Sequence, residues 1–136
     1  FPISQKEYFI RSRGTMVKMI AGQADGYSCN AGYGICNSSI RPDIQLAIHR
    51  LKQFRFIGLT DDWNTSICLF SVMFKLPCKL SFFINNREGN YNKTISNVID
   101  SADDALFRAG TSIFWNNVKR YKINQTRCQS CWTSKS

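Results

Sequence analysis

The sequence predicts a helix-rich α/β fold with few short strands. Three segments carry apolar side chains at helical spacing, and two short runs of aromatic and aliphatic residues are typical of strands. The chain has 136 residues, of which 43% are hydrophobic, so it is long enough to form one domain with a sizeable core. Its longest apolar stretch, residues 66–74, is too short to cross a bilayer, so we expect no transmembrane segment.

The N-terminal part is predicted to hold a helix and then a long loop. Ser4 and Glu7 have the spacing of a capping box, which predicts that a short helix begins here. Gly14 interrupts this helix before an apolar stretch at residues 16–21. Residues 22–39 contain four glycines and two cysteines, a composition that predicts a loop.

Two helices with a strand between them are predicted in the middle of the chain. Pro42 is placed at the first position of a helix whose apolar residues are Ile44, Ala47, Ile48 and Leu51. No motif places a nucleophile or carboxylate beside His49, so we predict that it lies at the surface. Residues 54–59 are predicted to form a strand, and Thr60 to cap the next helix. The apolar stripe predicted for that helix consists of Trp63, Ile67, Phe70 and Phe74.

A second strand and the longest helix are predicted in the C-terminal part. Residues 80–84 are predicted to form the strand, and residues 85–93 a polar loop. Ser101 and Asp104 form a cap signal for a helix that extends to about Tyr121. One face of this helix is predicted to carry Phe107, Phe114, Val118 and Tyr121.

The chain is basic, with 18 Lys and Arg against 9 Asp and Glu and a formal net charge of +9. The cations are dispersed along the chain, so the charge favours acidic surfaces of any kind as partners. Nucleic acid is disfavoured, because the sequence has neither zinc-finger spacing nor an aromatic RNA-binding strand. The hypothesis that the protein is a basic module that binds polyanions therefore rests on net charge alone.

The even number of cysteines predicts disulfides. The six are Cys29, Cys36, Cys68, Cys78, Cys128 and Cys131. Fifteen pairings are formally possible, and the simplest are the local closures of Cys29 with Cys36 and of Cys128 with Cys131. Free thiols, a metal site or redox chemistry are the open alternatives. A metal is not expected, because zinc sites usually repeat the C-x2-C pair that occurs once here.

Four sequons make asparagine glycosylation a further expectation. They begin at Asn37, Asn64, Asn92 and Asn124. Cysteines and sequons together favour an oxidising lumen or the secretory pathway.

Several motifs in order resemble the C-terminal half of Golgi-type carbohydrate sulfotransferases, in particular the heparan sulfate 6-O-sulfotransferases and their protist and algal relatives. The motifs are Lys18-Met-Ile-Ala-Gly22, Phe56-Ile-Gly-Leu-Thr-Asp-Asp-Trp63, Asn86-Arg87-Glu-Gly89 and Asp100-Ser-Ala-Asp-Asp-Ala-Leu-Phe107. The resemblance implies a sulfotransferase-like half-domain over residues 1–123, followed by a cysteine-containing tail over residues 124–136. It also implies a partial P-loop-type fold without the nucleotide-binding N-terminal half, and a Golgi-type location.

Members of this family transfer a sulfuryl group from 3'-phosphoadenosine 5'-phosphosulfate (PAPS) to a sugar hydroxyl. The resemblance places the phosphate-binding loop and the catalytic base in the half that this chain does not contain, so no catalytic residue and no cofactor are expected here. If PAPS or acceptor binding persists, Lys18 and Arg87 are the candidate contacts. Gly14, Met16 and Val17 replace hydrogen-bonding residues of the family, which argues against PAPS binding.

The sequence therefore predicts a non-catalytic, sulfotransferase-like accessory or scaffold subunit. Such a subunit would dock on other proteins of a larger assembly through an exposed apolar and aromatic seam. One alternative is the C-terminal half of a PAPS-dependent carbohydrate sulfotransferase, and a second is a basic module that binds polyanions.

Overall fold

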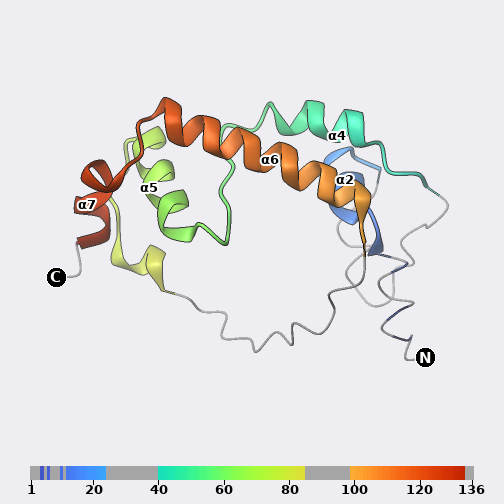
Figure 1. The fold of residues 1–136 in the computed structure, drawn as a ribbon, viewed down its shortest axis with the longest axis horizontal. Coiled ribbons are helices and arrows are strands. Elements are labelled where there is room, and N and C mark those ends of the chain that lie inside the picture. The colour runs from blue at the N-terminus through green and yellow to red at the C-terminus, as the bar shows by residue number, and fades with distance from the viewer. Residues whose placement is uncertain are drawn as a thin grey trace. The chain divides into compact units, whose positions relative to one another are not determined.

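The computed structural model describes residues 4, 6, 10, 12–23, 40–84 and 99–133. Over these residues the chain is helix-rich and forms no β-strand. The elements are α2 (Thr15–Ile20), α4 (Ile44–Leu51), α5 (Trp63–Phe74), the 3-10 helix η1 (Leu80–Phe83), α6 (Ser101–Arg120) and α7 (Gln125–Thr133) (Figure 1). The predicted α/β fold, and with it the partial P-loop-type fold, is wrong.

Neither of the two predicted strands forms. Residues 56–59 contain no helix, turn or bend, but no described segment pairs with them, and a β-ladder needs a second strand. Leu80–Phe83 coil into η1 instead. The Phe56 ring packs on Phe70 of α5, and Phe83 packs against cysteines of α5 and α7. Helices thus partly cover the rings of Phe56 and Phe83, whereas Phe54 and Ile84 at the ends of the predicted strands stay exposed.

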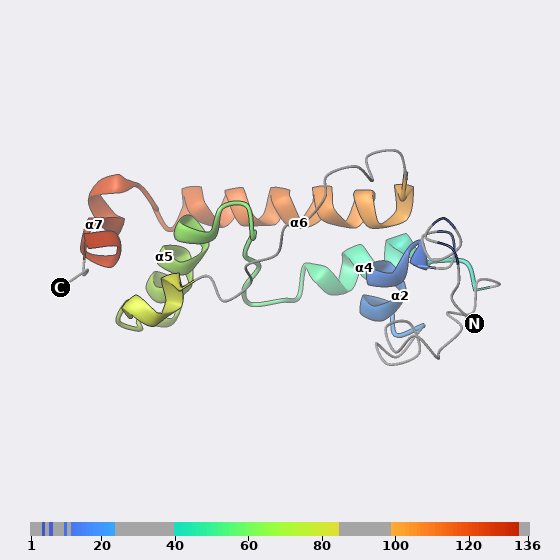
Figure 2. The same cartoon turned by 90° about the horizontal axis from the view of Figure 1, so that it is seen from below.

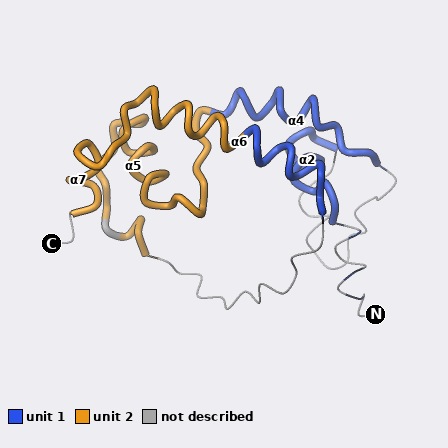
Figure 3. The backbone as a smooth tube through the Cα atoms, viewed as in Figure 1, with its two compact units in different colours: residues 1–54, 92–109 blue, residues 55–91, 110–136 orange. Residues whose placement is uncertain are grey.

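The chain divides into two compact units (Figure 3). Unit 1 comprises residues 1–54 and 92–109, and unit 2 comprises residues 55–91 and 110–136. The long helix α6 contributes residues 101–109 to unit 1 and residues 110–120 to unit 2.

In unit 1, α2 packs on α4. Two aspartates bind the N-terminus of α2, Asp100 just before α6 and Asp103 in the first turn of α6. The Asp103 carboxylate accepts hydrogen bonds from the amides of Val17 (2.9 Å) and Met16 (3.2 Å). Asp100 accepts from the Gly14 amide at 2.8 Å. These amides need such acceptors, because the first amides of a helix have no intrahelical partner. Asp100 also accepts a hydrogen bond from the Asp103 amide at 3.1 Å. It thereby caps α6, a role that was predicted for the next residue, Ser101.

Gly14 allows the close approach of these segments. It has φ of 67°, in the left-handed region, where a Cβ is strained. A Cβ built there would lie 2.4 Å from Pro42 Cγ. Pro42 was predicted to be the first residue of α4, and this prediction is wrong. Asp43 is the N-cap of the helix and accepts a hydrogen bond from the Leu46 amide at 2.9 Å.

In unit 2, α5 and α7 lie side by side (Figure 1, Figure 2), and two disulfides join α5 and the segment after it to α7. Cys68 pairs with Cys128, and Cys78 pairs with Cys131, with Cα atoms 5.8 and 5.1 Å apart. The predicted closure of Cys128 with Cys131 is wrong. Both cysteines lie three residues apart on one face of α7, so both are presented to the same neighbour. The other predicted closure, Cys29 with Cys36, falls outside the described residues.

The buried stripe of α6 differs from the predicted one. Leu106, Gly110 and Phe114 are buried, at steps of four residues, whereas Phe107 leaves 58% of its surface exposed. Phe107 follows Leu106 by one position and is therefore turned about 100° away from the stripe. At α5, Asp62 occupies the N-cap instead of Thr60, and its side chain makes no capping hydrogen bond.

Candidate functional site

An apolar groove lies in unit 2 between residues 56–60 and α5. Its volume is about 300 Å³, and residues that line it include Phe56, Leu59, Trp63, Ser66, Ile67 and Phe70. We call it the unit 2 groove. Trp63 is 46% exposed, and its indole Nε1 donates to the Phe82 carbonyl at 2.8 Å, so a large apolar side chain is held open to solvent.

Ser66 attaches one wall of the unit 2 groove to the other. Its hydroxyl accepts from the Leu59 amide at 2.8 Å and donates to the Leu59 carbonyl at 3.0 Å. Only 3% of Ser66 is exposed, so its hydroxyl depends on these partners. A single α5 side chain thereby sets the position of the segment before the helix.

Aromatic rings support the other end of this segment. The Phe56 ring lies edge-to-face on Phe70 with centroids 5.1 Å apart, and Phe70 lies 4.8 Å from Phe74. The Arg55 guanidinium lies 5.8 Å from the centre of the Phe74 ring. These contacts hold Phe56 in place, and no described residue forms a hydrogen bond with its backbone.

The backbone beside the unit 2 groove is available for pairing. Within the part of the chain that the structure describes, the amides and carbonyls of Phe56, Ile57 and Gly58 have no hydrogen-bond partner. Unpaired backbone groups are the template on which another extended chain can add as a strand.

A second hollow, the unit 1 cavity, has a volume of about 540 Å³. The charged residues that line it are Arg13, Lys18, Arg41 and Asp100. Lys18, one of the two candidate contacts if PAPS or acceptor binding persists, is only 4% exposed. The structure thus places Lys18 with two arginines and the Asp100 carboxylate, and this excess of positive charge favours an anion.

Beside this cavity lies Asp103, a carboxylic acid whose pKa is shifted by its surroundings. Burial raises its pKa above the ordinary value of 3.8, and the nearby Asp100 carboxylate adds to the rise. The hydrogen bonds from the Val17 and Met16 amides and the charge of Lys18 oppose it. Because both carboxylate oxygens already accept from α2, this group serves the fold.

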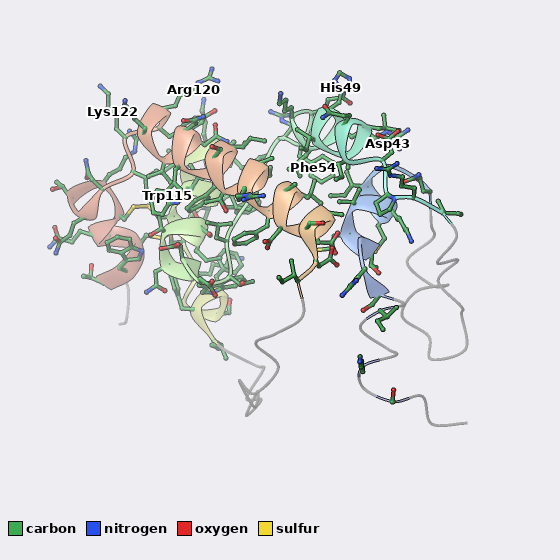
Figure 4. The ribbon with its side chains drawn as sticks, turned by 45° about the vertical axis from the view of Figure 1, so that its right-hand side comes forward. Asp43, His49, Phe54, Trp115, Arg120 and Lys122 are labelled. Carbon is green, nitrogen blue, oxygen red and sulfur yellow. A yellow bond between two sulfur atoms is a disulfide. The ribbon has the colours of Figure 1, made fainter. Side chains whose placement is uncertain are left out.

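The remaining predicted site residues fall in different places. Arg87, Asn37 and Asn92 lie outside the described residues. Asn64 and Asn124 are exposed, and the Asn124 side chain caps α7 by accepting from the Arg127 amide at 2.8 Å. His49 is exposed on α4, as predicted (Figure 4).

The described residues hold neither a cluster suited to a metal nor a helix suited to a membrane. They contain no group of three or more metal-ligating side chains. None of their helices is both long and apolar enough to cross a membrane. The two disulfides of unit 2 are typical of proteins from an oxidising, secreted environment.

Sequence reasoning overlooked the unit 2 groove and Ser66. Residues 54–59 were expected to be paired in a sheet, which would have used their backbone groups. Ser66 carried a usable signal, because a hydroxyl on the apolar side of a helix must find a hydrogen-bond partner.

Comparison with protein-family models, with curated proteins and with solved structures finds no match for this chain. The resemblance to carbohydrate sulfotransferases therefore stays a prediction.

Proposed function

We propose that this protein is a non-catalytic accessory or scaffold subunit that docks on another protein of a larger assembly. The observation that carries the proposal is the unit 2 groove, an apolar hollow beside unpaired backbone groups. Strand addition uses these two features together, since main-chain hydrogen bonds supply affinity and side-chain pockets supply specificity.

The occupant that fits is an extended segment with apolar side chains at every second position. Its backbone would pair with residues 56–58, and its alternate side chains would contact Trp63 and Ile67 in the groove. Ser66 holds Leu59 in place before binding, so little ordering of the receptor is required.

Charge argues that this segment comes from a different protein. Unit 2 contains nine Lys and Arg and three Asp and Glu, a net charge of +6. Two copies of such a surface repel each other, whereas an acidic partner is attracted. The partner is therefore an acidic protein with an extended apolar segment.

Photo-crosslinking from the groove tests the proposal. p-Benzoylphenylalanine replaces Trp63 in one variant and the exposed Gln129 of α7 in the control. In the cells that produce the protein, the variant at position 63 should form an adduct with one partner segment, and the control should not. Adducts of equal yield from both positions, or none from position 63, contradict the docking role.

The cross-linked segment then permits a test of strand addition. A synthetic copy should bind the full-length protein, and a copy that is N-methylated at alternate amides should bind about tenfold more weakly, because two backbone hydrogen bonds are lost. A copy methylated on the intervening amides is the matched control. Equal affinity of the two methylated copies would refute pairing with residues 56–58.

The second candidate function is binding of an anionic nucleotide such as PAPS, and the unit 1 cavity favours it. Arg13, Lys18 and Arg41 line that cavity. Titration calorimetry with adenosine 3',5'-bisphosphate tests this candidate, and Lys18→Met should abolish the heat while keeping the buried side-chain volume. Absence of heat with the unaltered protein excludes it.

The Golgi-type location implied by the resemblance belongs to the first proposal. Co-staining of the tagged protein with a Golgi marker tests it.

A further inference from the structure

A basic surface lies where α6 ends and α7 begins in unit 2. It consists of Lys119, Arg120, Lys122 and Arg127, all exposed, and we call it the α6–α7 basic surface. Figure 4 shows the Arg120 and Lys122 side chains pointing away from the ribbon. Within the described part of the chain, no ion-pair partner is found for these four residues.

The absence of acidic residues in the surrounding sequence strengthens this surface. The last carboxylate side chain is Asp104, and residues 105–136 contain six Lys and Arg but no Asp or Glu. No carboxylate side chain of this stretch can neutralise its cations, which favours the attraction of anionic groups.

Two of the four cations have a local structural role. Lys119 and Arg120 lie in the last turn of α6, where positive charge is favoured by the negative end of the helix dipole. Their presence would be expected on any solvent-exposed helix.

The other two cations are placed against local preference. Arg127 lies in the first turn of α7, at the positive end of the dipole, where a cation is disfavoured. Lys122 has φ of 52°, in the left-handed region. Its amide donates to the Lys119 carbonyl and the Ile123 amide to the Val118 carbonyl, the Schellman arrangement in which glycine is usual at the position of Lys122.

We propose that the α6–α7 basic surface binds an acidic segment, rich in aspartate and glutamate, of a partner protein. The inference rests on the proposed docking function and names a second contact of the same partner. A protein is favoured over nucleic acid or polysaccharide because the unit 2 groove, in the same unit, calls for alternating apolar side chains. Cations at an interface rim mainly accelerate association and make it dependent on salt.

The test uses two probes with the full-length protein. A fluorescent decaglutamate peptide reports on the basic surface, and a neutral peptide of alternating valine and threonine reports on the groove. In fluorescence anisotropy at low ionic strength, decaglutamate should bind, and Lys122→Gly and Arg127→Gln should each weaken it about threefold. Lys52→Gln, which removes one exposed cation from the end of α4, should leave the affinity unchanged.

Lys122→Gly also separates loss of binding from loss of folding. Glycine relieves the left-handed backbone, so the urea midpoint of this variant should rise while its affinity for decaglutamate falls. A lower midpoint together with weaker binding would point to misfolding, and Arg127→Gln then decides the matter.

The outcomes distinguish this inference from the proposed function. Binding of decaglutamate without binding of the valine–threonine peptide refutes the groove and keeps the basic surface. The reverse result refutes the basic surface. An equal loss of affinity for decaglutamate in Lys52→Gln also overturns the inference. So does tighter binding of a DNA oligonucleotide or heparin fragment that has the same net charge as decaglutamate.

Discussion

Removal of the two disulfides of unit 2, singly and together, is expected to show that they act on a shared loop. The first variant replaces Cys68 and Cys128 by alanine, the second replaces Cys78 and Cys131, and the third replaces all four. Alanine is chosen because Cys68 and Cys128 are buried, and a serine hydroxyl would lack a partner there.

The magnitude follows from the lengths of the loops that the bridges close in the unfolded chain. The sequence separations are 60 and 53 residues, so either bridge alone would stabilise the fold by about 4 kcal/mol. When one bridge is present, the other closes a much shorter loop. Its ends are then joined through the first bridge by the segments 68–78 and 128–131, a loop of about 13 residues that corresponds to about 3 kcal/mol.

Each two-alanine variant should therefore lose about 3 kcal/mol of unfolding free energy, and the four-alanine variant about 7 kcal/mol. The combined loss exceeds the sum of the single losses by about 1 kcal/mol, because the last bridge to be removed opens the long loop. The cost of the missing sulfur atoms enters both sides of this comparison and cancels.

Urea unfolding without reductant, followed by helical circular dichroism, measures these losses. A four-alanine variant whose loss equals the sum of the two single losses, or falls below it, would refute the shared-loop reasoning.

Three further predictions concern single residues. Gly14→Ala should lower the unfolding free energy in urea by at least about 1 kcal/mol, because the left-handed backbone disfavours a Cβ that would also approach Pro42; an unchanged midpoint would contradict this. Ser66→Ala should lower it by about 1–3 kcal/mol and accelerate hydrogen exchange at the Leu59 amide, which loses its acceptor. The raised pKa of Asp103 means that its contribution to stability is fully present below pH 3.8 and is lost as pH rises through the raised value. Asp103→Asn should remove that part of the slope in urea unfolding across acidic pH, and an unchanged slope would refute the assignment.

The helices were predictable because their signals are local. Apolar spacing in residues 44–51 and 63–74 predicted α4 and α5, and the start of α6 at Ser101 followed from a cap signal of neighbouring residues. The finer details depended on packing. Leu106 takes the buried place on α6 that was expected of Phe107, because the choice between adjacent positions is made by what lies opposite.

The two strands were not predictable because short apolar runs do not specify their partners. Residues 54–59 and 80–84 would suit a sheet or a covering of helices equally well. The Phe56 ring packs on α5, and no described residue pairs with its backbone. The feature that carries the proposed function therefore lies where the local prediction failed.

By itself, the sequence determined the net charge of +9, the even number of cysteines, the acid-free C-terminal stretch and the positions of the main helices. These follow from composition and from contacts within a few residues. Only the tertiary structure decided that Cys68 pairs with Cys128, that Asp103 caps α2 and that Lys18 faces a cavity with two arginines. Each of these joins segments tens of residues apart, and their meeting depends on how apolar faces pack, which no local pattern encodes.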